Sequence, residues 1–423
     1  RSCGRSSPGG WVSIRGLGPR RRSSVSAPRP VGPLQGIRVI ELAGLGAAPY
    51  AGMMLADMGA EVIRVERVPP PPAYPDVLAR GRRSVALDLK QTEGVSVLLR
   101  LVESADVLIE GFRPGVTERL GFGPKPCMER NERLIYGRMT GWGQEGPLSK
   151  RAGHDLNYIA LSGALLAIGP AGGKPVPPLN LVGDFGGGLL LAFGVASALV
   201  ERQRSGRGQI VDAAMLDAAA SFMGMFCGFR SLGLFEDATG ENMLSGAAHF
   251  YDTYETKDGG FVAVAAIEPE FYRRLVDKLG LDPDEFLPHG FRGVGVRQDP
   301  AAWAVLKVRL AELFRTRTRA QWVELLEDTD TCVAPVLGLS EAAAHPHNQA
   351  RATFVDIDGV TQNSPAPRFS RTPAEIPEPA RRPGEDTLSV LEQNGLDREE
   401  IDRLMGLGVV SWPDRRAQED TDG

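Results

Sequence analysis

A stretch near the start of the chain alternates between strand-like and helix-like patterns at the spacing of a βαβ unit. The β-branched run 37–42 is followed by a glycine turn over 44–49, by helical spacing over 50–58 and, after the stop at Gly59, by a second strand-like run over 61–66. Parallel strands require a crossover connection of this kind. The segment therefore predicts a parallel sheet whose ligands bind at the carboxyl ends of the strands.

The glycine turn departs from the fingerprint of a nicotinamide-dinucleotide site. Pro49 occupies the position of the third glycine, and Arg67 directly follows Glu66, the acid that would bind a ribose. An arginine at this point suits a phosphate-bearing ligand better than a bare ribose.

The alternation continues along the first half of the chain, which predicts an α/β fold built on a parallel sheet. Further strands are expected over 84–87, 106–109, 134–139 and 209–212, and helices over 94–102, 189–203 and 213–222. The 423 residues, 42% of them hydrophobic, are enough for two domains.

Composition argues against several other classes of protein. The net charge of -5 gives no reason to expect nucleic-acid binding, and the four cysteines are too far apart for a zinc knuckle or a disulfide framework. His345 and His347 have no carboxylate cluster nearby, so no metal site is predicted. No run of about 18 uncharged apolar residues occurs, so no membrane span is predicted.

Basic residues recur beside the predicted strands of the sheet. We expect them to line one rim of the sheet and to form a cradle for a phosphorylated nucleotide, although each alone is typical of a solvated surface. They are Arg67, Arg80, Arg82, Arg83, Lys90, Arg113 and Arg119.

Two proton-carrying side chains, His154 and Asp184, lie at the two ends of a compact segment rich in glycine. Asp184 stands between Gly183 and the run Gly186–Gly188, just before the predicted helix 189–203. A structural interpretation is available for each, since an aspartate before a helix is typically an N-cap and an isolated histidine is typically a hydrogen-bonded structural residue. The wider chain favours a catalytic pair.

The second half of the chain predicts a smaller domain and a return to the first. The turn 257–260 joins two alternating runs, 250–255 and 261–265, as a hairpin. Glu268-Pro269 starts a helix over 270–279, where Glu268 could simply be a capping residue. Helices are expected over 301–314 and 320–326. The run 332–337 is expected to be a strand returning to the large domain. The Pro-rich segment 364–383 is expected to wrap the surface, and 387–407 to form a helix pair.

Together these patterns predict four parts. Residues 1–33 lie outside the fold, residues 34–224 form a large domain, residues 225–335 a small domain with linkers, and residues 336–423 a segment returning to the large domain. Residues 1–33 hold seven arginines and no acid, which is the composition of an organellar transit peptide, although an incomplete gene model explains it equally well. The expected compartment is cytoplasmic for a bacterial chain and mitochondrial or peroxisomal for a eukaryotic one, with no C-terminal peroxisomal signal.

Several motifs occur in the order in which one known family carries them, from Leu34 to about Val410. The motifs are Leu34-Gln-Gly-Ile-Arg-Val-Ile-Glu-Leu42, Leu87-Asp-Leu-Lys90, Gly111-Phe-Arg-Pro-Gly-Val116, Thr140-Gly-Trp-Gly-Gln144, Ala152-Gly-His-Asp-Leu-Asn-Tyr158, Pro178-Leu-Asn-Leu-Val-Gly-Asp-Phe-Gly-Gly-Gly188, Gly208-Gln-Ile-Val-Asp-Ala-Ala-Met215 and Ala266-Ile-Glu-Pro-Glu-Phe271. By these motifs the chain resembles the class III CoA-transferase family, also called CaiB/BaiF.

The resemblance implies a Rossmann-like large domain, a smaller α/β domain and an interlocked homodimer, with each active site between the large domain of one subunit and the small domain of the other. It implies that His154 and Asp184 are the proton-transfer pair and that Glu268 hydrogen-bonds the histidine. It also implies that the CoA ester is contacted by Arg67, Leu87, Asp88, Leu89, Lys90, Gly153, Asp155, Leu156, Asn157 and Tyr158.

The motifs around His154 and Glu268 resemble the branch of the family that interconverts the (R) and (S) epimers of 2-methylacyl-CoA thioesters. This chemistry needs a base on one face of the α-carbon and an acid on the other, so no cofactor is expected apart from the CoA of the substrate. A backbone N–H near Asp184 is the expected donor to the thioester oxygen of the enolate. The alternatives are a CoA transferase, in which Asp184 attacks the thioester and forms a covalent intermediate, and a non-catalytic binder of CoA esters.

One loop departs from the family pattern. The chain has Ser245-Gly-Ala-Ala-His249 where Asp-Gly-Gly-Ala-Pro is usual, at a position expected near the acyl chain. His249 is interpreted as a surface or core histidine in preference to a new residue of the acyl pocket. The Met-rich run 221–226 is interpreted as core filling or as an adaptable wall of that pocket.

Overall fold

The computed structural model describes residues 31–71, 76–294, 296 and 298–413. Its centre is a seven-stranded sheet in the order β12-β3-β2-β1-β4-β5-β6. Six strands are parallel, and β12 is an antiparallel edge strand. The strands are β1 (Arg38–Leu42), β2 (Glu61–Glu66), β3 (Arg82–Leu87), β4 (Val107–Glu110), β5 (Ile135–Thr140), β6 (Ile210–Ala214) and β12 (Val410–Ser411). The predicted α/β architecture is confirmed.

The central strands are buried on both faces, which is why they read as continuous apolar runs. On one face, α1 (Ala47–Asp57) and α7 (Gly186–Ser205) pack against the sheet. On the other face lie α2 (Thr92–Glu103), α4 (Pro124–Arg130) and, from the far end of the chain, α16 (Thr387–Gln393) and α17 (Arg398–Gly406). The large-domain core therefore needs residues from both ends of the chain.

The small domain is built on a three-stranded antiparallel sheet of β7 (Tyr251–Glu255), β8 (Phe261–Ala265) and β9 (Val333–Pro335). It is covered by α10 (Pro269–Leu279), α11 (Pro283–Phe286), α12 (Pro300–Phe314) and α13 (Arg319–Leu326). The prediction that 332–337 returns to the large domain is wrong, because Val333 and its neighbours pair with β8. A strand pattern in the sequence does not show which strand will be its partner, and here the partner is β8 of the small sheet.

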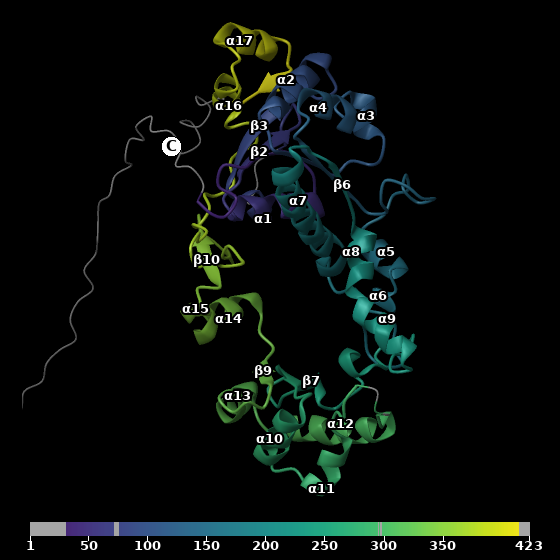
Figure 1. Cartoon of the computed structure of the whole chain (residues 1–423). Helices are drawn as coiled ribbons and strands as arrows, with labels where there is room; N and C mark the ends of the chain where they lie inside the picture. The colour runs from purple at the N-terminus through teal and green to yellow at the C-terminus, as the bar shows by residue number, and fades with distance from the viewer. Residues whose placement is uncertain (1–30, 72–75, 295, 297, 414–423) are drawn as a thin grey trace, which may run out of the picture.

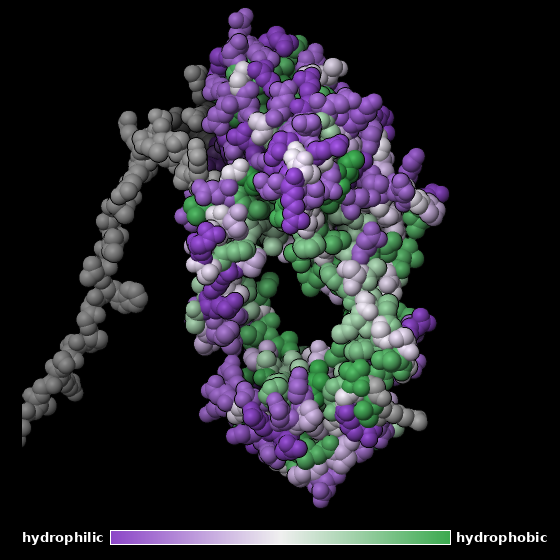
Figure 2. Space-filling model, in the orientation of Figure 1, coloured by the Kyte–Doolittle hydropathy of each residue, from purple (hydrophilic) through white to green (hydrophobic). Residues whose placement is uncertain are grey.

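The two domains are joined on both sides, so that one chain forms a ring (Figure 1). One connection contains α5 (Asp155–Leu161), α6 (Ala164–Ala167), α8 (Met215–Phe222) and α9 (Gly224–Ser231). The other contains α14 (Leu339–Ala344), α15 (Pro346–Ala350), β10 (Phe354–Ile357) and β11 (Val360–Asn363). His345 and His347, expected in a loop, thus lie between α14 and α15 and within α15. Figure 2 shows an opening through the middle of the ring whose rim is largely hydrophobic.

The returning hairpin is fixed to the large domain through Arg80, whose side chain is almost fully buried. Its guanidinium contacts Asp57 Oδ2 at 2.6 Å and donates to Gln362 Oε1 at 2.8 Å and to the Asn363 carbonyl at 2.7 Å. A buried charge is stable only when it is paired in this way. One arginine therefore joins the hairpin β10–β11 to α1.

One helical stretch, Leu181–Ser205, has the length and hydropathy of a membrane span, whereas none was predicted from the sequence. In the fold α7 packs against α1, β5 and β6, as the core helix of an α/β domain does. Its other face leaves Leu189, Phe193 and Val200 exposed in the single chain.

Candidate active site

A cavity of about 720 Å³ lies at the carboxyl ends of the first strands of the sheet, as the βαβ pattern predicts. Its walls include the segments that follow β1, β2 and β3. Among the residues expected to contact a CoA ester, it brings together Arg67, Leu87, Asp88, Leu89 and Lys90. Phe112 and Leu120 close one side.

Five of the seven basic residues expected in the cradle do not line the cavity, and three of these five are held in ion pairs elsewhere. Arg80 is paired with Asp57, Arg82 with Glu41 at 2.6 Å, and Arg83 with Glu61 at 3.2 Å. Arg82 and Arg83 open β3, whereas the cavity lies where the parallel strands finish. They belong to the buried and edge ion pairs of the fold, so this part of the prediction is wrong.

Arg113 and Arg119 are exposed and do not line the cavity, although their neighbours Phe112 and Leu120 do. Arg113 lies close enough to Tyr158 for its charge to act on the phenol, opposing the rise in pKa that burial gives that group. The loop after β4 thus faces the segment that contains His154.

His154 is the N-cap residue of α5 and is exposed. Its backbone N–H donates to Asn157 Oδ1 at 3.0 Å, and its carbonyl accepts from Asn157 N at 2.8 Å, which fixes the start of the helix. The imidazole is therefore presented by the first turn of a rigid element. Leu156 and Asn157 are exposed beside it, whereas Tyr158 is buried, donates to the Gly153 carbonyl and packs edge-on against Trp142.

Asp184 lies in a π-helical turn, Leu181–Phe185, that leads directly into α7. Asp155 holds this turn in place, because its buried Oδ2 accepts hydrogen bonds from Gly183 N at 2.6 Å and Asp184 N at 2.9 Å. Asp155 was predicted to contact the ligand. In the structure its carboxylate is directed at the backbone of Asp184, and it joins the His154 segment to the Asp184 turn.

The carboxyl group of Asp184 is half-buried beside a glycine. Asn180 Nδ2 donates to Asp184 Oδ2 at 3.0 Å, and a Cβ added to Gly46 would lie 2.8 Å from the same oxygen. Gly46 also has φ of 70°, so only glycine fits there without strain. Neither contact could be found from sequence, although the glycine turn 44–49 was visible in it.

Burial raises the pKa of Asp184, and the negative charge of Asp155 raises it further. The hydrogen bond from Asn180 and the electrostatic effect of His154 oppose this rise. Asp184 and His154 are thus near enough to influence each other. A carboxyl group with a raised pKa can act as an acid while a nearby imidazole acts as a base. Such a pair can therefore remove one proton from a ligand and return another.

The expected backbone donor to an enolate oxygen is not found at the glycine-rich turn. Gly183 N and Asp184 N are bonded to Asp155, and Phe185 N donates to the Asn180 carbonyl at 3.3 Å. Gly186 N donates within the turn as well. The π-helical geometry occupies these groups, so this part of the prediction is wrong.

Glu268 lies in the small domain as the N-cap residue of α10, and its side chain is exposed. Figure 1 shows α10 across the ring from α5, which carries His154. Within one chain Glu268 is therefore not brought to His154 and Asp184.

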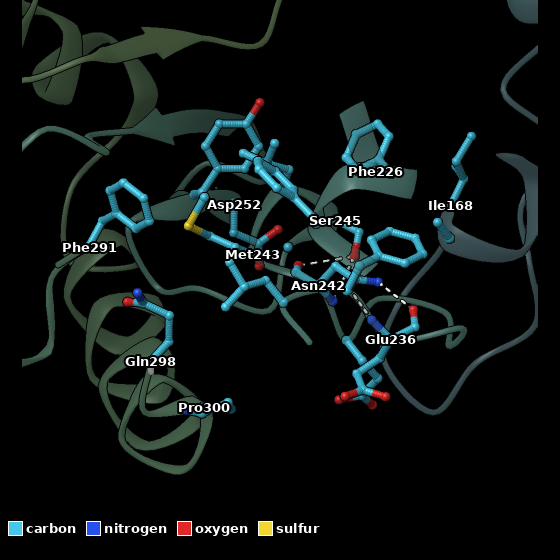
Figure 3. Close-up of a pocket in the computed structure, with 18 of the residues that line it drawn as sticks. Ile168, Phe226, Glu236, Asn242, Met243, Ser245, Asp252, Phe291, Gln298 and Pro300 are labelled. Atoms are coloured by element: carbon cyan, nitrogen blue, oxygen red, sulfur yellow. Dashed lines mark hydrogen bonds between the residues drawn. The ribbon is translucent and has the colours of Figure 1, made fainter. Parts of the chain in front are cut away.

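A second, larger cavity of about 1110 Å³ begins two residues from Asp184, at Val182, and extends to the small domain (Figure 3). Its walls are mainly apolar and aromatic. They include Phe222, Met223, Phe226, Phe229, Met243 and Trp303. Of the altered loop, Ser245 and Gly246 line this cavity.

His249 belongs to the core of the small domain, as interpreted from the sequence. It is fully buried, and its Nε2 lies 2.5 Å from the hydroxyl of Tyr272. Burial lowers the pKa of His249 to about 3, so it is neutral at ordinary pH. Its ring anchors the loop and does not face the cavity.

No group of three or more metal-ligating side chains occurs in the part of the chain that the structure describes. His345 is paired with Glu327 at 3.0 Å.

Comparison with known proteins identifies the class to which this fold and site belong. The family model "CoA-transferase family III" matches residues 34–387, so the chain belongs to that family. It is 47% identical to mouse alpha-methylacyl-CoA racemase over 381 residues (89% of this chain, 97% of the relative), and 46% identical to the human racemase over 377 residues (88% and 96%). The crystal structure of a CAIB/BAIF family protein from Brucella suis matches with a TM-score of 0.73 at 26% identity, covering 86% of this chain and all of that one.

Proposed function

We propose that the protein is an isomerase that interconverts the epimers of 2-methylacyl-CoA thioesters. The observation that carries this proposal is the neighbouring pair His154 and Asp184, in which Asp184 has a raised pKa. High identity to two alpha-methylacyl-CoA racemases over nearly the whole folded chain supports it.

In the proposed reaction, neutral His154 removes the α-proton of one epimer and becomes an imidazolium. The electron pair of the broken C–H bond passes into the thioester carbonyl and gives a planar enolate. Protonated Asp184 then donates its proton to the opposite face of the α-carbon, and the enolate collapses to the other epimer. The reverse reaction exchanges the roles of the two groups. The imidazolium stabilises the enolate through its charge.

The two cavities suggest how the thioester lies. The cavity at the sheet edge holds the nucleotide half of CoA, where Arg67 and Lys90 suit phosphates. The apolar cavity that begins at Val182 takes the acyl chain, and its methionines and phenylalanines adapt to branched carbon skeletons. Asp184 lies between the two.

We also propose that the working unit is an interlocked homodimer in which Glu268 of one subunit completes the site of the other. The ring with its hydrophobic opening and the exposed apolar face of α7 suit a second copy passing through the ring. The exposed position of Glu268, across the ring from His154, suits a role in the partner's site.

Co-expressed Asp184→Asn and Glu268→Gln chains test this arrangement. Heterodimers purified through two different tags should recover about half of wild-type activity, because one of their two sites then contains no substitution. Each variant expressed alone supplies the baseline. Activity no higher than that of the better single variant would show that each site is built from one chain.

The function itself is tested with a single epimer of a 2-methylacyl-CoA in D₂O without an acceptor acid. We expect deuterium to enter at the α-carbon while the opposite epimer accumulates, as NMR and chiral separation would show. Transfer of CoA to an added carboxylic acid, with an adduct on Asp184 and no exchange without the acid, would instead make the protein a transferase. Binding of the ester with neither reaction would make it a non-catalytic binder.

A further inference from the structure

A short C-terminal segment forms one wall of the cavity at the sheet edge. Ala380, Arg381, Arg382 and Pro383 line it, as Arg67 and Lys90 do. From the sequence this Pro-rich stretch was expected only to wrap the surface. In the structure it brings two additional guanidinium groups to the site where a phosphorylated ligand is expected.

The segment is attached to the edge of β3 on both sides of the arginines. Before them, Gly81 N donates to the Glu378 carbonyl at 2.8 Å. After them, Gly384 N donates to Ser84 Oγ at 2.9 Å, and Ala86 N donates to Thr387 Oγ1 at 3.0 Å. Because the backbone is held on both sides, Arg381 and Arg382 are kept at the cavity and the segment itself need not become ordered on binding.

The charges around the cavity are not balanced. Arg64 is satisfied by Glu66 at 2.8 Å and by Asp76 at 3.1 Å. Arg381 and Arg382, by contrast, share one carboxylate, Glu385, at 3.7 Å each. Arg67 and Lys90 form no ion pair within the described residues. The lining as a whole holds five basic residues (Arg64, Arg67, Lys90, Arg381 and Arg382) and three acidic ones (Glu66, Asp76 and Asp88). The cavity therefore carries a net positive charge, which favours a polyanionic ligand.

The cavity is also connected to Asp184. Gly44 and Leu45 line it, and the next residue, Gly46, lies directly against the Asp184 carboxyl group. A ligand with phosphates in the cavity can therefore reach Asp184 by a flexible arm laid across this glycine loop. A CoA thioester has this form.

We propose that Arg381 and Arg382, together with Arg67 and Lys90, bind the phosphates of the nucleotide half of the CoA thioester. The proposal rests on the function proposed above and adds a specificity determinant contributed by the C-terminal segment. Guanidinium groups suit this role because they bind phosphate oxygens in a bidentate manner. The two arginines bind and orient the substrate, and they take no part in the proton transfers.

The test compares a double variant, R381Q/R382Q, with the wild type on two substrates: a 2-methylacyl-CoA and the same acyl group on pantetheine, which lacks the nucleotide. We expect KM for the CoA ester to rise about 10- to 100-fold with kcat within twofold, as for a lost contact that ground state and transition state share. KM for the pantetheine ester should be unchanged. R381K/R382K should recover part of the loss, and Arg371→Gln, on an exposed arginine of the same segment outside the cavity, is the control.

An equal loss on both esters, or an unchanged KM for the CoA ester, would overturn the proposal. If the wild type racemises neither ester, calorimetry of free CoA and of pantetheine gives the same comparison. If CoA then binds more tightly than pantetheine, and this difference disappears in R381Q/R382Q, the nucleotide site is supported although the proposed racemase function is not. For phosphate contacts we expect the wild type to lose its preference for CoA over pantetheine at high salt. We expect R381Q/R382Q to show no such preference at any salt concentration.

Discussion

Replacement of Asp184 by asparagine should lower kcat for epimerisation by about 10² to 10⁴-fold, because an amide can neither donate nor accept the α-proton. The substitution keeps the shape of the side chain and an oxygen that can accept the bond from Asn180. Asp184 is half-buried and makes no ion pair that the structure records, so folding should be little affected. The loss should therefore fall on the chemical step and leave the affinity for the ester nearly unchanged.

Single-epimer turnover and α-deuterium incorporation in D₂O would measure this loss. Asp217→Asn is the matched control, since Asp217 is an exposed aspartate of α8 that does not line either cavity. Activity of the Asp184→Asn chain within tenfold of the wild type would exclude Asp184 from proton transfer. His154→Gln should cause a loss of the same order, since each proton must pass through one of the two groups.

Replacement of Asp155 should have the second largest effect, although we assign it no direct part in the chemistry. Its carboxylate accepts from the N–H groups of Gly183 and Asp184, and an unsatisfied buried donor costs about 1–3 kcal/mol. Asp155→Ala should lower the free energy of unfolding by about 2–6 kcal/mol for the two groups. Displacement of Asp184 should also lower kcat by about 10²-fold.

Asp155→Asn separates the electrostatic role from the structural one, since it keeps an oxygen acceptor and removes the charge. The negative charge of Asp155 raises the pKa of Asp184, so its removal should lower that pKa. In the direction in which Asp184 is the base, the acidic limb of kcat/KM should move to lower pH. If the pH profile of kcat/KM does not move, Asp155 only holds the turn in place and does not tune the pKa of Asp184. Thermal unfolding of both variants and of Asp217→Asn gives the stability comparison.

Most of the sheet could be predicted because its strands are short, buried on both faces and separated by glycine stops. The second strand lies at 61–66 as expected, and the hairpin strand at 261–265 likewise. Both have local patterns that suffice to define them. The helix expected over 189–203 begins earlier, at Gly186, and the three glycines of its first turn are packed closely against α1 and α8.

Features that depend on distant partners could not be predicted. The edge strand β12 and the hairpin β10–β11 are too short to carry a pattern. The buried role of Arg80 depends on Gln362 and Asn363, which are more than 280 residues away. An arginine before a strand has the same local appearance whether it faces a phosphate or a buried carboxylate.

The candidate site shows the same division. The sequence motifs indicated His154 and Asp184 as a pair, and the structure places them in adjacent turns. Asp155 holds the Asp184 turn because its carboxylate points at the backbone of that turn, and a sequence motif does not specify the direction of a side chain. Arg381 and Arg382 lie in a Pro-rich stretch without periodicity, and their place in the cavity lining depends on the attachment of this stretch to β3, which no local pattern predicts.

The attachment of the C-terminal segment to β3 has a consequence for synthesis on the ribosome. Thr387 bonds to Ala86 across 301 residues of chain, and β12 covers the outer edge of β3. The large domain is encoded first, yet its nascent form exposes an unpaired strand edge until residues near 411 emerge. Such an edge invites pairing with other chains, so the growing polypeptide needs protection from aggregation until the residues that form β12 have been made.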